Sequence, residues 1–252
     1  IGVNTVRILL QAGAIVEVID IIAEEESETA RNLKKEFNSS HLIFSKIDIT
    51  DETSVTEKIN QSVSLFGKID VLINHSHFKG NPEELIPHSD FFASLEEYPF
   101  QIWKRTVDVN LNGLFLTTKA VGKQMIKQKK GVIVNTSSTY GIVSPNRKIY
   151  TDSGINSPIS YATTKAAIIN FSKYLATHWA EHNIRVNTIA PGLTDTDMMR
   201  KNTPDNVLNE VISSISLKRV AKPEEIANVA LLSSSDLMSY VTGQVIRVDG
   251  GM

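Results

Sequence analysis

Tyr161 and Lys165 form the residue pair whose types and spacing most clearly indicate catalysis in this chain. They are four residues apart in a stretch of helical periodicity that begins near Ser160, so both side chains lie on one face of the helix. A phenol with a pKa of about 10 is a poor base at neutral pH, but an adjacent ammonium group favours its ionised form. The pair therefore predicts general acid/base chemistry. The simpler alternative is an amphipathic helix with a surface tyrosine and lysine.

Two hydroxyl side chains favour the catalytic interpretation. Ser137 and Ser138 follow an apolar run at 132–134, which predicts a strand over residues 131–137. Ligands of open α/β sheets bind outside the carboxyl ends of the strands, so these hydroxyls are expected beside a binding crevice. Among the six tyrosines, Tyr161 alone has a lysine four positions later.

Asp20 ends another predicted strand and is a candidate for binding a nucleotide. A carboxylate at this position accepts hydrogen bonds from the ribose hydroxyls of an adenosine. A 2′-phosphate would be repelled by Asp20, and the next residues, Ile21 and Ile22, supply no arginine to offset that repulsion. The sequence therefore predicts NAD as the cofactor. The alternative is an aspartate that caps the following helix.

The elements that must position these residues alternate along the chain. Strands are predicted at residues 14–20, 42–48, 71–74, 131–137, 184–189 and 244–248, with helical periodicity between them. This alternation calls for right-handed βαβ units and a parallel sheet with helices on both faces. The predicted fold class is α/β, a doubly wound Rossmann-type sheet in a single domain over residues 1–252. Glu17 interrupts the apolar pattern of its strand.

Composition excludes several classes of function. A net charge of −2 and a pI near 6.3 give no general attraction to nucleic acid or anionic lipid. No stretch approaches the roughly 18 apolar residues of a membrane helix. The chain has no cysteine, which excludes disulfides and fits a cytoplasmic location. The expected partner is a small-molecule substrate, with no nucleic acid and no membrane.

No metal site is predicted. His178 and His182 are four residues apart, but Trp179 stands where the zinc-protease pattern requires glutamate. His75 and His77 share a loop that offers no evident third ligand.

The ordered motifs resemble those of the short-chain dehydrogenase/reductase family almost from end to end. Tyr-x-x-x-Lys after a strand that ends in Ser-Ser resembles the active site of that family. The other matching segments are Asp48-Ile49-Thr50, Trp103 with Val109-Asn110-Leu111, Arg185 to Gly192, and Gly243 to Gly251. The resemblance implies an NAD-dependent oxidoreductase that transfers hydride between nicotinamide and a secondary alcohol or ketone.

The resemblance also implies residue roles. Tyr161 is the general acid/base, Ser138 rather than Ser137 holds the reacting oxygen, and Lys165 binds the nicotinamide ribose and lowers the pKa of Tyr161. Asn110 completes a proton relay through water. The cofactor-binding set is Ile1, Gly2, Asp20, Asp48, Ile49, Asn74, Tyr161, Lys165, Pro191, Gly192, Thr194 and Thr196. A homodimer or homotetramer is implied, built through the helices that carry Asn110 and Tyr161.

Two departures from the family pattern concern the cofactor. Only Ile1 and Gly2 remain of the glycine-rich phosphate loop, and the first strand is absent, so the chain is expected to be truncated. A gap is then expected between the strands that end at Asp20 and Asn74, and the chain is expected to be unstable or to aggregate. In addition, Asn74-His75-Ser76-His77 replaces the usual Asn-Asn-Ala-Gly, which places side chains where small residues let the cofactor approach closely.

Two other functions compete with a dehydrogenase. A noncatalytic binding scaffold is suggested by the missing phosphate loop, but such a protein has no need for the set Asn110, Ser138, Tyr161 and Lys165. A nucleotide-sugar epimerase or dehydratase shares Tyr-x-x-x-Lys but needs a large C-terminal substrate domain, whereas this chain ends at Met252.

Two long segments favour a polar substrate. The interval from Ser138 to Tyr161 and the interval from Asn74 to Asn110 are rich in polar side chains, and each leaves the carboxyl end of a strand. Residues 140–161 are also similar to oxidoreductases of bacterial gene sets for flagellin or surface nonulosonic-acid sugars. A polar lid over a sugar or sugar derivative is therefore predicted. The alternative is that one or both segments form a subunit contact.

Overall fold

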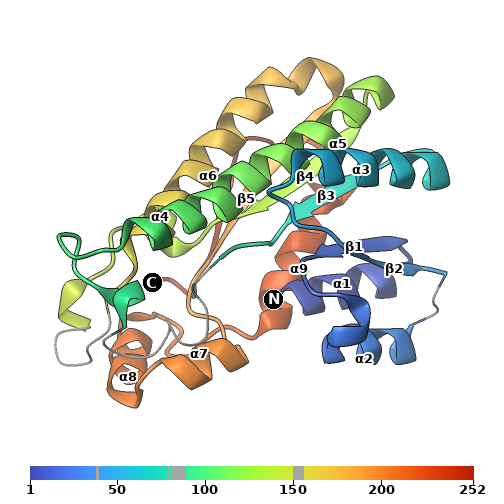
Figure 1. The fold of residues 1–252 in the computed structure, drawn as a ribbon. Helices are drawn as coiled ribbons and strands as arrows, with labels where there is room; N and C mark the ends of the chain where they lie inside the picture. The colour runs from blue at the N-terminus through green and yellow to red at the C-terminus, as the bar shows by residue number, and fades with distance from the viewer. Residues whose placement is uncertain (38–39, 79, 81–88, 150–155) are drawn as a thin grey trace.

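Parallel strands form the centre of the structure, a computed structural model that describes residues 1–37, 40–78, 80, 89–149 and 156–252 (Figure 1). The strands are β1 (Val16–Asp20), β2 (Leu42–Lys46), β3 (Val71–Asn74), β4 (Gly131–Thr136), β5 (Ile184–Pro191) and β6 (Val245–Val248). Each lies within two residues of its predicted bounds, because runs of β-branched residues between polar turns mark strands clearly. The predicted α/β fold is confirmed, with every strand pair parallel.

Helices connect the strands and cover the sheet. In chain order they are α1 (Gly2–Gln11), α2 (Glu28–Glu36), α3 (Glu52–Phe66), α4 (Phe100–Val107), α5 (Leu114–Gln128), α6 (Ile159–His178), α7 (Asp197–Asn202), α8 (Asp205–Ser214) and α9 (Pro223–Ser234). A π-helical turn over Asp108–Gly113 joins α4 to α5 without a break. Figure 1 shows α3, α5 and α6 together on one side of the larger sheet, with α1 and α9 on the other.

The core follows from the alternation of side chains along the central strand β4. Ile133 is fully buried in the cluster formed with α3, α5 and α6, whereas Val132 and Val134 pack in a second cluster with Ile226 and Ala230 of α9. Successive side chains of a strand point to opposite faces, so a strand covered on both faces reads as a continuous apolar run. This arrangement fixes the carboxyl end of β4, where Ser138 follows.

The strands form two separate sheets. The larger has the order β3-β4-β5-β6, and the smaller consists of β1 and β2. The sequence predicts a gap between the strands that end at Asp20 and Asn74, and this is confirmed: among the described residues, β1 pairs only with β2 and β3 only with β4. The smaller sheet is covered on one face by α1 and α2, through the cluster of Leu10, Leu33 and Leu42.

Glu17 departs from the apolar pattern because its side chain faces α3. Its carboxylate pairs with Lys58 Nζ at 2.5 Å and accepts hydrogen bonds from the hydroxyls of Ser62 and Ser45, at 2.5 and 3.0 Å. The Glu17 and Lys58 side chains are only 15% and 16% exposed. A buried charge requires such partners, and the sequence alone did not reveal them because they lie on α3 and β2.

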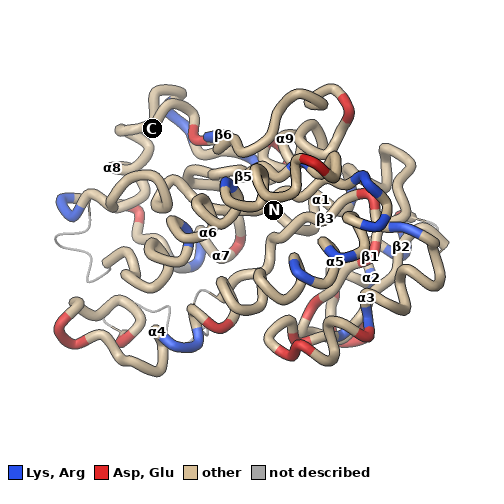
Figure 2. The backbone as a smooth tube through the Cα atoms, turned by 90° about the horizontal axis from the view of Figure 1, so that it is seen from above, with Lys and Arg blue, Asp and Glu red and all other residues tan. Residues whose placement is uncertain are grey.

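Basic and acidic residues are interspersed along the outer helices and loops (Figure 2), in agreement with the small net charge. In the part of the chain that the structure describes, no helix is long and apolar enough to span a membrane.

Candidate active site

The residues predicted to be catalytic come together at the carboxyl end of β4. Tyr161 lies in the first turn of α6, which starts after Pro158, and Lys165 lies one turn further on. Lys165 is 2% exposed, and its Nζ donates a hydrogen bond to the Thr136 carbonyl at 2.9 Å. The same Nζ lies 5.6 Å from the centroid of the Tyr161 ring. The lysine is thereby held between the end of β4 and the phenol.

Ser138 and Ser137 have different surroundings. The Ser138 side chain forms a hydrogen bond with Tyr161 and accepts another from the backbone N–H of Tyr140 at 3.2 Å. In contrast, the Ser137 hydroxyl donates to the Lys165 carbonyl at 2.7 Å. The structure therefore places Ser138 beside the phenol and uses Ser137 to attach β4 to α6.

The pKa of Tyr161 is opposite in direction to the expectation. Burial raises it above its usual value, the Ser138 hydrogen bond opposes this effect, and the nearby Tyr140 adds to it. Desolvation of the phenolate is the largest effect in this structure, so the net pKa lies above its usual value. The lowering expected from Lys165, whose ammonium group donates to the Thr136 carbonyl, stays a prediction. At neutral pH the group is a phenol, the form that donates a proton.

Asn110 lies in the π-helical turn and is 1% exposed. Its Oδ1 accepts a hydrogen bond from the Phe78 backbone N–H at 2.6 Å, and its Nδ2 donates to Thr164 Oγ1 at 3.1 Å. The amide therefore joins the loop after β3 to α6 directly below Tyr161. Single π-helical turns are often retained at functional sites, because the extra residue changes the direction of a side chain.

The side chain of Asn74 holds the end of β3. Its Nδ2 donates to Asn135 Oδ1 at 2.8 Å and to Thr118 Oγ1 at 3.2 Å, and its Oδ1 accepts from Thr117 Oγ1 at 3.2 Å. These bonds connect β3 to β4 and α5. Asn74 is thus a support beneath the predicted cofactor site.

His75 follows Asn74 and is fixed by two hydroxyls. One ring nitrogen, Nε2, lies 3.0 Å from Thr5 Oγ1, and the other, Nδ1, lies 2.7 Å from Thr136 Oγ1. The pKa of His75 is lowered to about 3, with burial as the largest cause and the positive charge of Lys165 as a smaller one. The imidazole is therefore neutral at physiological pH and joins α1 to the end of β4.

The predicted adenosine-binding residues lie around the smaller sheet. Asp20 is exposed at the end of β1, and its carboxylate accepts a hydrogen bond from the Ile22 backbone N–H at 3.0 Å. Asp48 is exposed after β2 and accepts two hydrogen bonds from Thr50. Ile49 packs against Gly113, where an added Cβ would lie 2.6 Å from its Cγ1.

The remaining candidates for cofactor binding lie at two other places, the start of α1 and the segment after β5. Ile1 and Gly2 begin α1, whose N-terminus has no side-chain cap. Pro191, Gly192, Thr194 and Thr196 follow one another from the end of β5 to the start of α7. Gly192 is required there, because a Cβ would lie 2.8 Å from the Cα of Asp249.

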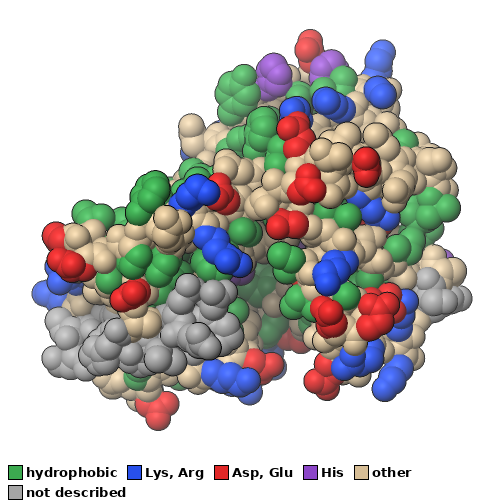
Figure 3. Space-filling model, viewed as in Figure 1, with side chains coloured by type: hydrophobic (Ala, Val, Ile, Leu, Met, Phe, Trp, Pro, Cys, Tyr) green, Lys and Arg blue, Asp and Glu red, His purple; other side chains and the backbone are tan. Residues whose placement is uncertain are grey.

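A dinucleotide fits most of this residue set. The exposed Asp20 carboxylate suits a ribose diol, the uncapped start of α1 suits a phosphate, and Tyr161 with Lys165 suits the second ribose. Loop 75–77 is the part that differs from the expected small residues. Figure 3 shows the surface hollowed near the chain start, between the parts over α7 and over α1.

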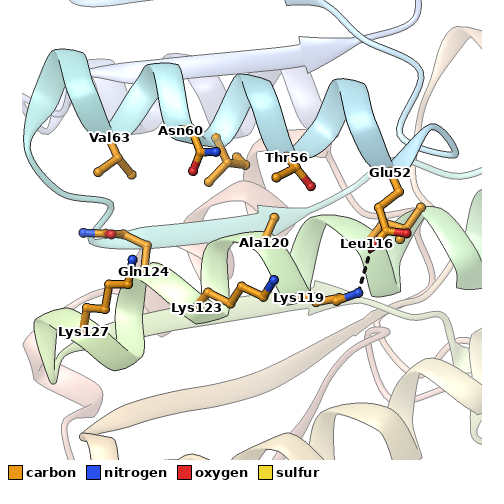
Figure 4. Close-up of a pocket in the computed structure, with 11 residues that line it drawn as sticks. Glu52, Thr56, Asn60, Val63, Leu116, Lys119, Ala120, Lys123, Gln124 and Lys127 are labelled. Atoms are coloured by element: carbon orange, nitrogen blue, oxygen red, sulfur yellow. Dashed lines mark hydrogen bonds and ion pairs between the residues drawn. The ribbon is translucent and has the colours of Figure 1, made fainter.

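A groove of about 200 Å³ lies elsewhere, between α3 and α5 (Figure 4). Its α5 side carries Lys119, Lys123 and Lys127 at successive turns, and Lys119 pairs with Glu52 of α3 at 2.7 Å. None of the predicted catalytic or cofactor-binding residues lines this groove. It is therefore separate from the candidate active site.

The two polar segments meet beside the first turn of α6. Asn156 Nδ2 donates to the Phe92 carbonyl at 3.3 Å, and the hydroxyls of Tyr98 and Ser160 are 2.8 Å apart. Both contacts lie close in sequence to Tyr161. Parts of the predicted lid, residues 81–88 and 150–155, lie outside the described residues.

His178 and His182 lie at the surface. His178 stacks on Tyr174, with ring centroids 5.4 Å apart, and His182 lies 3.6 Å from the Glu181 carboxylate. Among the described residues, no group of three or more metal-binding side chains is gathered.

Sequence reasoning did not identify several residues of the site. Thr164 orients Asn110, Thr136 binds both His75 and Lys165, and Tyr140 lies near Tyr161. Tyr140 offers a usable signal, because it follows Ser138 by two residues at a strand end. The threonines offer none, since their partners are distant in sequence.

Comparison with known proteins agrees with this geometry. Residues 1–252 match a family model described as enoyl-(acyl carrier protein) reductase. The 3-oxoacyl-[acyl-carrier-protein] reductase FabG of Thermotoga maritima is 36% identical over 257 residues, which cover all of this chain and 93% of the relative. The FabG of Chlamydia muridarum is 34% identical over 252 residues, with 100% and 92% coverage. The chain belongs to the short-chain dehydrogenase/reductase family.

A solved structure extends the likeness to the fold. A short-chain dehydrogenase from Leptospira borgpetersenii with bound NAD⁺ is 29% identical, with a TM-score of 0.83 over 99% of this chain and 87% of that one. The chain is thus an NAD(P)-dependent oxidoreductase. The relatives do not support the resemblance to surface-sugar enzymes, because both curated names specify acyl substrates.

Proposed function

We propose that this oxidoreductase transfers hydride between NAD and the keto or secondary alcohol group of a 3-oxoacyl thioester, with Tyr161 as the acid/base. The observation that carries the proposal is the contact of Tyr161 with Ser138 on one side and Lys165 on the other. The curated relatives named as 3-oxoacyl reductases support the substrate class.

Each side chain of the site has its own role when the carbonyl group is reduced. Tyr161 and Lys165 would hold a nicotinamide nucleotide, which would supply the hydride for the carbonyl carbon. The Ser138 hydroxyl donates a hydrogen bond to the carbonyl oxygen of the substrate. As the C=O π bond breaks, the Tyr161 phenol donates its proton to that oxygen, and the carbonyl group becomes an alcohol. The buried Lys165 ammonium stabilises the resulting phenolate. In the oxidative direction the phenolate accepts the proton from the alcohol.

The substrate class is tested by incubating the protein with NADH and acetoacetyl-CoA and following the loss of NADH absorbance. Steady consumption of NADH that depends on both components is expected. A panel of keto sugars forms the second arm, because the contacts of Asn156 with Phe92 and of Tyr98 with Ser160 favour a polar cover near Tyr161. If the protein reduces the keto sugars but does not reduce acetoacetyl-CoA, the substrate is a sugar and not a 3-oxoacyl thioester.

Asp20 is expected to make NAD bind at least about tenfold more tightly than NADP, a difference of about 1.4 kcal/mol. The cause is repulsion between its exposed carboxylate and a 2′-phosphate. Asp20→Ala should reduce the ratio to about threefold or less, as measured by quenching of protein fluorescence with NADH and NADPH. Glu25→Ala is the control, because Glu25 is exposed close by but lies beyond the strand end. Tighter binding of NADPH to the parent protein would refute this prediction.

A noncatalytic scaffold is the competing function. A scaffold would bind NADH but would not consume it with either acetoacetyl-CoA or the keto sugars. The proposed enzyme both binds NADH and consumes it. We also propose a homodimer or homotetramer, built through the helices that carry Asn110 and Tyr161, and a cytoplasmic location, which the absence of cysteine supports.

A further inference from the structure

The carboxyl end of β4 is held differently on its two sides. Towards β5, the two strands stay in register as far as Thr136 and Ile189. Towards β3, the register ends one residue earlier, at Asn74 and Asn135. The residue after β3 is His75, and its side chain contacts the end of β4, with Nδ1 2.7 Å from Thr136 Oγ1. The imidazole therefore continues the connection between β3 and β4 where the backbone pairing stops.

The His75 ring is fixed at both nitrogens. Nε2 lies 3.0 Å from Thr5 Oγ1 of α1, and Nδ1 makes the contact with Thr136. With a pKa of about 3 the ring is neutral at physiological pH, so one nitrogen donates and the other accepts. A hydroxyl can do either, so the two contacts do not depend on which nitrogen carries the proton.

Thr136 also holds the ammonium group of the site. Its carbonyl accepts the hydrogen bond from Lys165 Nζ at 2.9 Å, and both residues are buried. A β-branched threonine has few χ1 rotamers, so a hydrogen bond at Oγ1 also limits the orientation of the backbone that carries this carbonyl. One residue therefore connects the imidazole of His75 to the ammonium group of Lys165.

We propose that His75 is a positioning residue for the reaction. By holding the Thr136 hydroxyl, it sets the carbonyl that keeps the Lys165 ammonium group beside Tyr161. That ammonium group lies 5.6 Å from the centroid of the Tyr161 ring, and its stabilisation of the phenolate depends on this distance. The role rests on the proposed function, because His75 acts through Lys165. It concerns a histidine that stands where the family pattern has asparagine.

Two substitutions of His75 each keep one of its two hydrogen bonds. His75→Asn places an amide near the position of Nδ1, so it is expected to keep the bond to Thr136 and lose the bond to Thr5. His75→Gln places its amide near the position of Nε2, so it is expected to do the reverse. Thr136→Val and Thr5→Val remove the two hydroxyls one at a time and keep a β-branched side chain.

The measurements are kcat and KM for acetoacetyl-CoA at saturating NADH, at a temperature where thermal unfolding shows every variant to be folded. His75→Gln and Thr136→Val should each lower kcat about five- to tenfold, the effect of one hydrogen bond of about 1 to 1.4 kcal/mol, while KM changes less than about twofold. In contrast, His75→Asn and Thr5→Val should keep at least about half of the parent kcat. In the double variant His75→Gln/Thr136→Val the two losses should not multiply, because both remove the same bond.

A merely structural role gives a different pattern. His75→Asn and His75→Gln each lose one hydrogen bond, so their Tm values would fall by similar amounts and their kcat values would fall together. Equal kcat values for these two variants would therefore overturn the proposal. An unchanged kcat in Thr136→Val would do the same, and this variant also decides the matter if His75→Gln does not fold.

NADH binding, measured by fluorescence titration, separates this proposal from the proposed function. Lys165 is also expected to bind the nicotinamide ribose, so His75→Gln and Thr136→Val should weaken NADH binding at least about threefold, whereas His75→Asn and Thr5→Val should not. If the parent binds NADH but reduces neither acetoacetyl-CoA nor the keto sugars, the proposed function fails and this binding pattern alone decides the role of His75. If the parent does not bind NADH, both proposals are wrong.

Discussion

Tyr161→Phe is expected to lower kcat at least about a hundredfold while the dissociation constant for NADH changes less than about twofold. The substitution keeps the ring near Lys165 but removes the hydroxyl that contacts Ser138. Without it, the proton required by the carbonyl oxygen must come from water, which is not positioned for transfer. Steady-state kinetics with NADH and acetoacetyl-CoA measure kcat, and fluorescence titration measures binding.

Tyr174→Phe is the matched control. Tyr174 lies on the same helix, but it is 61% exposed and stacks on His178 far from the phenol of Tyr161. Its loss should leave kcat unchanged. Comparable kcat values for the parent and Tyr161→Phe would exclude Tyr161 as the acid/base.

Glu17→Ala is expected to lower the free energy of unfolding by about 3 kcal/mol, because it leaves Lys58 largely buried without a counter-charge and removes the acceptor of two serine hydroxyls. For a chain of this size, that loss corresponds to a decrease in Tm of about 6–12 °C. Urea denaturation followed by circular dichroism gives the free energy, and thermal unfolding gives Tm.

An exposed ion pair on the same helix provides the comparison. Glu52 pairs with Lys119 at 2.7 Å, but the two side chains are 60% and 42% exposed. Glu52→Ala should therefore lower the free energy of unfolding much less than Glu17→Ala does. In the double variant Glu17→Ala/Lys58→Met, the loss should be smaller than in Glu17→Ala alone, since no buried charge remains. Equal losses for Glu17→Ala and Glu52→Ala would contradict this account.

The sequence predicted the strands well, and it predicted that Tyr161, Lys165 and Ser138 lie close together, for physical reasons. Strands such as β4 are buried on both faces, so their apolar runs are continuous, and turn residues limit them. Tyr161 and Lys165 are one helical turn apart, and that spacing places them together in any helix. The position of Ser138 follows from its place directly after β4.

Contacts between segments that are distant in the chain could not be predicted from the sequence. The pairing of Glu17 with Lys58 depends on how α3 packs across the smaller sheet. The direction of the Tyr161 pKa depends on its burial, which spacing does not specify. Similarly, the sequence shows that His77 stands where a small residue is usual, but it does not predict that the ring lies beside Tyr161. That position follows from the hydrogen bonds of Thr5 and Thr136 with His75 and of Asn110 with Phe78.

The π-helical turn at Asp108–Gly113 makes the helical rod from Phe100 to Gln128 sensitive to single-residue length changes. Each residue of an α-helix advances the side chains by about 100° around the axis. Deleting one residue would convert the turn to ordinary helix and rotate the buried stripe of α5, including Val121 and Met125, away from the core relative to Ile102 of α4. The length of this segment is therefore constrained in addition to the residue types at Asn110 and Gly113.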